Sequence, residues 1–261
     1  MFLSRRCKPY KMAYQATFKR YEIKYLLTAA QKAQILQAME PYMKLDRYGR
    51  TVIRNIYFDT NSFRLIRRSL EKPAYKEKLR IRSYQTAVDD DPVFIELKKK
   101  YQSVVYKRRL TLPEAQAMEA FRYNLPLPVH SQIAREIEYF RTYYGGLHPT
   151  VFLSYEREAF YALDGGEFRV TFDENILYRS NNFSLGSKVY GTPLLARGQT
   201  LMELKTAGGL PLWMSRELNR LRVYPTSFSK YGAAYKQMMA EMQTNRIRRN
   251  YYGFQFVPGS V

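Results

Sequence analysis

The chain has 261 residues, a formal net charge of +20 and a pI near 9.9, so we expect an anionic partner. One cysteine excludes an intrachain disulfide, and two histidines argue against zinc sites and against Ser-His-Asp or Cys-His catalysis. No secretory leader and no run of about 18 apolar residues is present, so we expect a cytoplasmic protein. The length fits a single domain over 1–261, in which 1–14 and 246–261 are expected to be flexible arms.

The amino-terminal half is predicted to contain mainly strands. After a strand ending near Tyr25, Thr28-Ala-Ala-Gln31 has capping-box spacing and predicts a helix over 29–39. β-Branched and aromatic residues predict the next strand, and polar breaks with Pro92 predict a hairpin followed by another strand and a short helix opened by Pro113. These strands are expected at 51–59, 75–84, 92–99 and 103–112.

The carboxy-terminal half is predicted to mix helices and strands. Apolar residues at helical spacing predict a helix over 131–144, stopped by Gly145-Gly146. Asp164-Gly165-Gly166 is a strong turn signal between two strands. Strands are expected at 150–161, 167–173 and 200–206, and helices around Trp213 and from after Ser229 to about Met242.

Charged residues, mostly basic, alternate with apolar ones in seven of these stretches. The stretches are 20–24, 78–82, 96–98, 107–109, 155–157, 169–173 and 203–205. Side chains on a strand alternate between faces, so each stretch puts its charges on one face. If the strands share a sheet, that sheet has a strongly basic face suited to a polyanion.

The fold class that follows is α+β with a mostly antiparallel sheet. The charged face cannot be the packed core, yet apolar residues such as Leu79, Ile95 and Val170 need cover on the other face. An eight-stranded antiparallel β-barrel with helices packed on the outside meets both demands, because the charges then line a solvated tunnel.

Two simpler interpretations compete with this tunnel. Any one alternating stretch is more often the solvent face of an ordinary sheet. Glu156 and Glu158 also fit the pattern poorly, because they lie on the other face of their strand from Arg157. Like charges on neighbouring strands repel, however, so basic residues on so many strands favour a ligand. Nucleic-acid binding is not favoured: the 24 tyrosines could stack on bases, but they also suit strands, and no RNP or helix-turn-helix pattern is present.

The order of the motifs resembles the VTC domain, the polyphosphate polymerase domain of vacuolar transporter chaperones, within the CYTH-like triphosphate tunnel metalloenzymes. The matching motifs are RYEIKY at 20–25, IYFDT at 56–60, LRIR at 79–82, FIELK at 94–98, SYER at 154–157, RVTFD at 169–173, MELK at 202–205 and FSKY at 228–231. The resemblance implies a tunnel barrel in which the γ-phosphate of ATP extends an inorganic polyphosphate chain with Mn²⁺ or Mg²⁺. It also implies that any membrane protein needed for export is a separate partner chain.

The resemblance carries over to individual residues. The implied catalytic tunnel residues are Lys24, Arg80, Arg82, Lys98, Arg157 and Arg169. The expected phosphate contacts are Lys78, Lys107, Arg109, Lys205, Ser229 and Lys230. Glu203 is the expected metal ligand, with Glu96 and Glu22 as further candidates. Ser229 equally fits a plain helix N-cap.

One departure from the related hydrolases bears on the reaction. Related triphosphatases and class IV type adenylyl cyclases carry Glu-x-Glu-x-Lys on the first strand, whereas this chain has Arg20-x-Glu22-x-Lys24. Loss of the first glutamate removes a metal ligand and an aid to water activation, while a polyphosphate end is already an anionic nucleophile. The sequence therefore favours a polymerase. A tunnel triphosphatase and a non-catalytic domain that binds polyphosphate or RNA are the alternatives.

Overall fold

The computed structural model describes residues 21–102 and 104–252, with side chains described up to residue 244. Ten strands are present in this part: β1 Tyr21–Leu27, β2 Met43–Leu45, β3 Thr51–Asp59, β4 Tyr75–Ser83, β5 Pro92–Tyr101, β6 Val104–Pro113, β7 His148–Ala162, β8 Arg169–Arg179, β9 Thr192–Pro193 and β10 Thr200–Thr206. Its helices are α1 Ala29–Met39, α2 Arg64–Leu70, α3 Glu114–Arg122, α4 Gln132–Tyr144, α5 Leu212–Arg220 and α6 Lys230–Tyr252. The expected arm at 1–14, Arg20, and residues 253–261 of the expected arm at 246–261 lie outside the described residues, whereas 246–252 continue helix α6.

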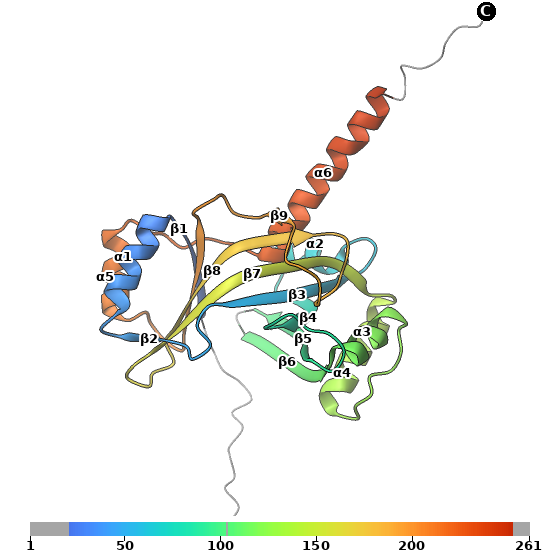
Figure 1. Cartoon of the computed structure of the whole chain (residues 1–261), viewed down its shortest axis with the longest axis horizontal. Coiled ribbons are helices and arrows are strands. Elements are labelled where there is room, and N and C mark those ends of the chain that lie inside the picture. Colours follow the sequence, from blue (N-terminus) through green and yellow to red (C-terminus); the bar gives the residue numbers. More distant parts are fainter. Residues whose placement is uncertain (1–20, 103, 253–261) are drawn as a thin grey trace, which may run out of the picture.

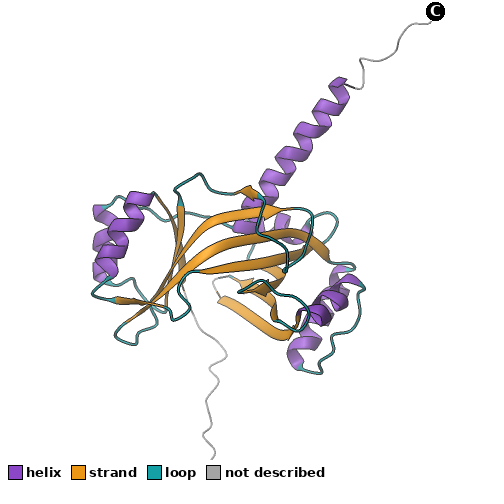
Figure 2. Cartoon of the chain, viewed as in Figure 1, coloured by secondary structure: helices purple, strands orange, loops and turns teal. Residues whose placement is uncertain are grey.

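The strands form one antiparallel sheet (Figure 2). Its main path runs β1-β10-β8-β7-β3-β4-β5-β6. The short strands β2 and β9 add to β7 and β8. The α+β class and antiparallel pairing are therefore confirmed. The sheet is not closed: within the described ranges, no backbone pairing joins β1 to β6. Closure into an eight-stranded barrel stays a prediction, although Lys98 on β5 reaches within 3.5 Å of Glu22 on β1 and shows how strongly the sheet curls.

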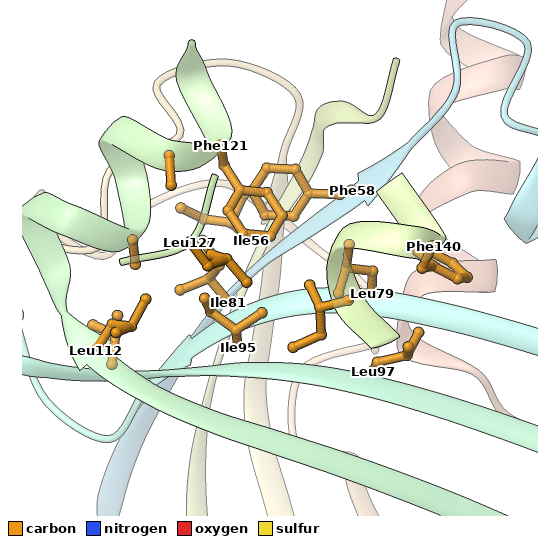
Figure 3. Close-up of a cluster of buried hydrophobic side chains, with 14 of the residues drawn as sticks. Ile56, Phe58, Leu79, Ile81, Ile95, Leu97, Leu112, Phe121, Leu127 and Phe140 are labelled. Carbon is orange, nitrogen blue, oxygen red and sulfur yellow. The ribbon is translucent and has the colours of Figure 1, made fainter. Parts of the chain in front are cut away.

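Helices cover the outer, convex face of the sheet in two groups. On one side α3 and α4 pack over β3 to β6, where Leu79, Ile81, Ile95 and Leu97 are fully buried (Figure 3). On the other side α1 and α5 pack over β1, β8 and β10 (Figure 1). Each such side chain contributes about 1.5 to 3 kcal/mol by leaving water, so the apolar half of the alternating pattern anchors the sheet.

The start of α6 packs on the opposite, inner face. Tyr231 stacks on Tyr57 with ring centroids 4.8 Å apart, and Ala234 and Met238 bury Leu153 and neighbouring apolar residues of the same face. The rest of α6 projects away from the body of the protein (Figure 1). One part of the inner face is therefore an apolar surface that packs against α6, and the charged positions lie next to it.

Most predicted elements form where the sequence placed them. The capping box of Thr28 and Gln31 is present, and the strands over 51–59 and 200–206 have the predicted bounds. Helix α6 runs to Tyr252. The predicted end lay near Met242 because the later turns carry no strong apolar stripe that would mark a helix. Helix α2 was not predicted: its first amides are capped by Asp59, six and seven residues earlier in the chain, and its N-cap residue Phe63 is left-handed.

The glutamates of β7 that fitted the pattern poorly belong to a separate network on the outer face. Glu156 pairs with Arg50, and Glu158 lies 3.0 Å from Lys32 of α1. Lys32 and Arg50 also reach Glu174 of β8, at 3.0 and 2.9 Å. These charges fasten α1 to the sheet and do not interrupt the inner face.

No helix in the described ranges is long and apolar enough to cross a lipid bilayer.

Candidate functional site

Backbone pairing brings the predicted cationic positions of the strands onto the inner face. Directly opposed residues of an antiparallel ladder share a face. The opposed sets are Glu22 with Lys205 and Arg169, Lys24 with Glu203, Asp173 with Arg157, Arg80 with Glu96 and Arg109, Lys78 with Lys98 and Lys107, and Arg82 with Phe94. Ser229 and Lys230 join them from the start of α6. The structure thus gathers the residues, and their roles stay predictions.

The first cluster is built around Glu96, which is 2% exposed. Its carboxylate lies 2.7 Å from Arg80, 2.8 Å from Lys107 and 2.9 Å from Arg109, with Arg82 at 3.7 Å. Burial disfavours the charged carboxylate, but Arg80, Arg82 and Lys107 outweigh it and hold the pKa of Glu96 well below its usual range. A permanently ionised Glu96 fixes these cations side by side, while Lys107 and Arg109 keep part of their surface in solvent.

The second cluster joins residues of β1, β7, β8 and β10 to the start of α6. Lys230 lies within 3.1 Å of Glu203 and also contacts Asp173. Arg157 grips Asp173 through two N–H groups, and Lys24 lies 3.4 Å from Glu203. Despite burial, Lys230 and Lys24 hold the pKa of Glu203 well below its usual range, and Lys230 and Arg157 lower that of Asp173. Both carboxylates are therefore anionic and already engaged.

Lys78 lies between the two clusters, next to Lys24 of the second cluster and Arg80 of the first. Lys78 donates a hydrogen bond to the Ser229 hydroxyl at 3.0 Å, and Lys24 donates to the Phe228 carbonyl at 2.8 Å. Burial, and then repulsion from Lys24 and Lys98, lowers the pKa of Lys78 to about 7. This ammonium is only partly charged near neutral pH, and an arriving polyanion would favour its protonated form.

Ser229 does serve as an N-cap of α6, because its hydroxyl accepts a hydrogen bond from the Gly232 amide at 3.1 Å. The same oxygen is the partner of Lys78. The Ser229 hydroxyl therefore belongs both to the helix cap and to the cationic cluster. The amino-terminal turn of α6 lies beside the lysines, an arrangement that favours phosphate.

Two predicted cations lie farther out. Arg169 is exposed at the first position of β8, and Lys205 opposite it is half-buried. Burial lowers the pKa of Lys205, opposed by Glu22 and Glu203. The structure therefore places Arg169 at the rim of the basic face.

Several inner-face residues were not assigned as site residues from the sequence. Asp173 is an even number of residues after Arg169 on β8, so both side chains face inward. This alternation could have identified Asp173 as the partner of Arg157. Tyr57 accepts a hydrogen bond from Arg80 at 2.7 Å, and Tyr155 lies beneath Arg157 and Lys230. Both tyrosines lie within the motifs IYFDT and SYER, but these motifs gave them no role, because most of what they contact comes from other strands and from α6.

The carboxylates of the inner face differ in how well they suit a metal ion. No group of three or more His, Cys, Asp or Glu side chains within the described part of the chain could hold an ion. Glu96 does not fit, because its oxygens are taken up by cations. Glu203 fits better: one oxygen faces Lys230 and Lys24, while the other has Arg157 at 3.5 Å. Mg²⁺ bound with phosphates needs only one or two protein carboxylates, so Glu203, with Glu22 on the adjoining strand, suits that kind of site.

Comparison with known proteins supplies a family and a fold. The model of the VTC domain matches residues 19–239. A candidate adenylate cyclase from Bacillus halodurans is similar in structure, with a TM-score of 0.51 at 14% identity over 82% of this chain and 96% of that one. A candidate adenylate cyclase from Vibrio parahaemolyticus gives 0.46 at 12% identity over 85% and 99%. No curated protein matches the sequence.

Proposed function

Because the chain belongs to the VTC domain family, we propose that it transfers the γ-phosphate of ATP to the end of an inorganic polyphosphate chain on the inner face of the sheet. The observation that carries the proposal is the pair of ionised, cation-bound carboxylate clusters, with Lys78 between them. Phosphoryl transfer depends on positioning and charge neutralisation, and this face supplies both.

The cations divide the work by their chemistry. The guanidinium groups of Arg80 and Arg109 are fixed in orientation by hydrogen bonds to Glu96, and they can offer paired N–H groups to phosphate oxygens. Lys78, Lys98 and Lys107 form a row across three strands and act as point charges along the chain of phosphates. Lys230 and the amides behind Ser229 stabilise the phosphoryl group that is transferred.

The proposed reaction balances without a proton acceptor. A terminal oxygen of polyphosphate forms a bond to the γ-phosphorus, and the bond from that phosphorus to the β,γ-bridging oxygen breaks. ADP leaves with the electron pair of the broken bond. A divalent cation, when bound at Glu203, would neutralise phosphate charge and orient the triphosphate.

Synthesis suits the inner face better than hydrolysis does. Water must lose a proton to attack, which requires a base whose pKa is near the working pH. Glu96, Asp173 and Glu203 all have lowered pKa values, so each is a poor base. Lys78 has a pKa of about 7, but a bound polyanion favours its protonated form, which cannot accept a proton. A polyphosphate end carries its negative charge already, and the preference inferred from Arg20 gains an independent argument here.

The test is incubation of the protein with ATP and Mn²⁺ or Mg²⁺, followed by separate assays for polyphosphate, ADP and orthophosphate. We expect one ADP to be released for each phosphate unit added to polyphosphate, and we expect Arg80→Ala to form neither product. ADP with orthophosphate alone would identify a triphosphatase. Tight polyphosphate or RNA binding without any product would identify a binding domain and contradict the proposal.

A further inference from the structure

The outer face of the sheet carries two buried arginines that no carboxylate neutralises. Arg54 on β3 is 8% exposed, and Arg179 at the end of β8 is 5% exposed. Neither forms an ion pair with any Asp or Glu in the described ranges. Arg54 lies opposite Ser83 and Ser154 in the ladder, on the face away from the proposed phosphoryl-transfer site. These arginines therefore need an explanation of their own.

Arg179 has hydrogen-bond partners although it has no counter-ion. It donates to the carbonyls of Asn182, Ser184 and Tyr190 and to the Ser187 hydroxyl. Its guanidinium also lies 3.5 Å from the ring centroid of Phe152. The connection 180–199 thus wraps around this side chain, and its Leu185 packs with the cluster of β3 and β7. Figure 1 shows the same connection passing over these strands.

Arg54 has no such partners in the described part of the chain. Its Nε atom is buried without a hydrogen bond. The hydroxyl of Ser154, its neighbour across the ladder, is also buried and unpartnered. The next acid along β7, Glu156, is already bonded to Arg50 and Asn175. Burial lowers the pKa of Arg54, and it lowers that of Arg179, with a smaller contribution from Arg54.

We propose that Arg54, Ser154 and Arg179 form a second anion site beneath the connection 180–199, and that it takes a small tetrahedral oxyanion, orthophosphate. A buried guanidinium is costly until an anion meets it, and its flat array of N–H groups matches two phosphate oxygens. The Ser154 hydroxyl adds a donor for a third oxygen. Bound phosphate would tie the connection, through Arg179, to the middle of the sheet. The site stands on its own and does not depend on the polymerase activity.

The test compares Arg54→Met with Arg50→Met, which removes an equal charge from an exposed arginine that already has an acidic partner. Melting temperatures are measured against orthophosphate at constant ionic strength with chloride, while saturating tripolyphosphate occupies the inner face. We expect phosphate to raise the melting temperature of the native protein and of Arg50→Met, and the rise to disappear in Arg54→Met. Without phosphate, Arg54→Met should be at least as stable as the native chain, because it loses a buried unpaired charge.

An equal phosphate-dependent rise in all three proteins, or no rise in the native protein, would overturn the site. If Arg54→Met does not fold, Ser154→Ala replaces it, and it should bind phosphate more weakly while keeping both arginines. Hydrogen exchange provides an independent measurement: phosphate should slow exchange in 180–199 of the native protein. Unchanged exchange there would contradict the tie between the anion and the connection.

Discussion

At the scale of single residues, the inner face solves a problem of like charges. Cations on neighbouring strands would repel one another at a cost of about a few kcal/mol for each unscreened pair. Glu96, Asp173 and Glu203 offset this repulsion and hold each cation in a fixed place. Each of these carboxylates is buried and ionised, so the face keeps its geometry before the substrate arrives.

The first prediction uses two adjacent arginines of β6 that point to opposite faces. Arg109 faces inward and bonds Glu96 and Tyr84, whereas Arg108 faces outward and bonds Glu136. Arg109→Ala should weaken tripolyphosphate binding about 10- to 150-fold, the effect of losing about 1.5 to 3 kcal/mol from a charged hydrogen bond. Arg108→Ala should bind nearly as the native protein does. Calorimetric titration measures both, and equal losses would show that only net charge matters.

The second prediction follows from the pKa of Lys78, which is about 7 in the free protein. Bound triphosphate favours the charged ammonium and raises this pKa, so binding at pH 8 should take up a proton at Lys78. Affinity should therefore fall as the pH rises above 7. Titrations in buffers of different ionisation enthalpy count the protons. Lys78→Arg, which stays charged, should take up fewer protons than the native protein, and the same number in both would rule out this role.

Period-two alternation was enough to predict which residues share the inner face. It applies because the strand geometry, not the fold, decides the face on which each side chain lies. The inward position of Asp173 could have been noticed in the same way, but the alternation could not show that Tyr57 and Tyr155 support Arg80 and Arg82, since these contacts join residues of different strands. Arg54 was missed for the same reason: its surroundings come from β7 and from the connection after β8.

At the scale of elements, α6 links the site to the core. Ser229 and Lys230 reach the charged residues, and the next residue, Tyr231, donates a hydrogen bond to buried Asp59 at 2.9 Å. Asp59 in turn accepts hydrogen bonds from the first amides of α2. One carboxylate therefore fixes two helices, and this is why α2 could not be predicted from a local capping motif.

The third prediction concerns this link. Tyr231→Phe should lower the free energy of unfolding by about 1 to 3 kcal/mol, because Asp59 and Thr150 each lose a buried hydrogen-bond partner. Tyr235→Phe one turn later is the control, since its ring packs on Phe63 and no hydrogen bond to its hydroxyl is found among the described residues. Urea unfolding compares the two. Similar small changes would show that the contact of Tyr231 with Asp59 adds little.

At the scale of the whole molecule, the charges of the described part of the chain are divided between two faces of the sheet. On the outer face, Arg50 and Lys32 pair with the glutamates of β7 and β8, while Arg54 and Arg179 have no carboxylate partner among the described residues. The inner face keeps an excess of positive charge around its few acids. The composition predicted a polyanion, and the sheet register brings the basic positions that period-two alternation assigned to one face together on the inner side.

The last prediction separates ligand binding from general charge repulsion. Tripolyphosphate at 100 times its dissociation constant should add about 2.7 kcal/mol of stability, or about 5 to 10 °C in melting temperature for a chain of this size. Salt should act in two opposite ways. As the Debye length falls from about 10 Å at 0.1 M to about 3 Å at 1 M, the free protein should become more stable because self-repulsion is screened, while the increment from tripolyphosphate should shrink. Thermal melts across a chloride series, with Arg80→Ala as the control, measure both trends. A tripolyphosphate increment as large in Arg80→Ala as in the native protein would mean that the inner face is not where the anion binds.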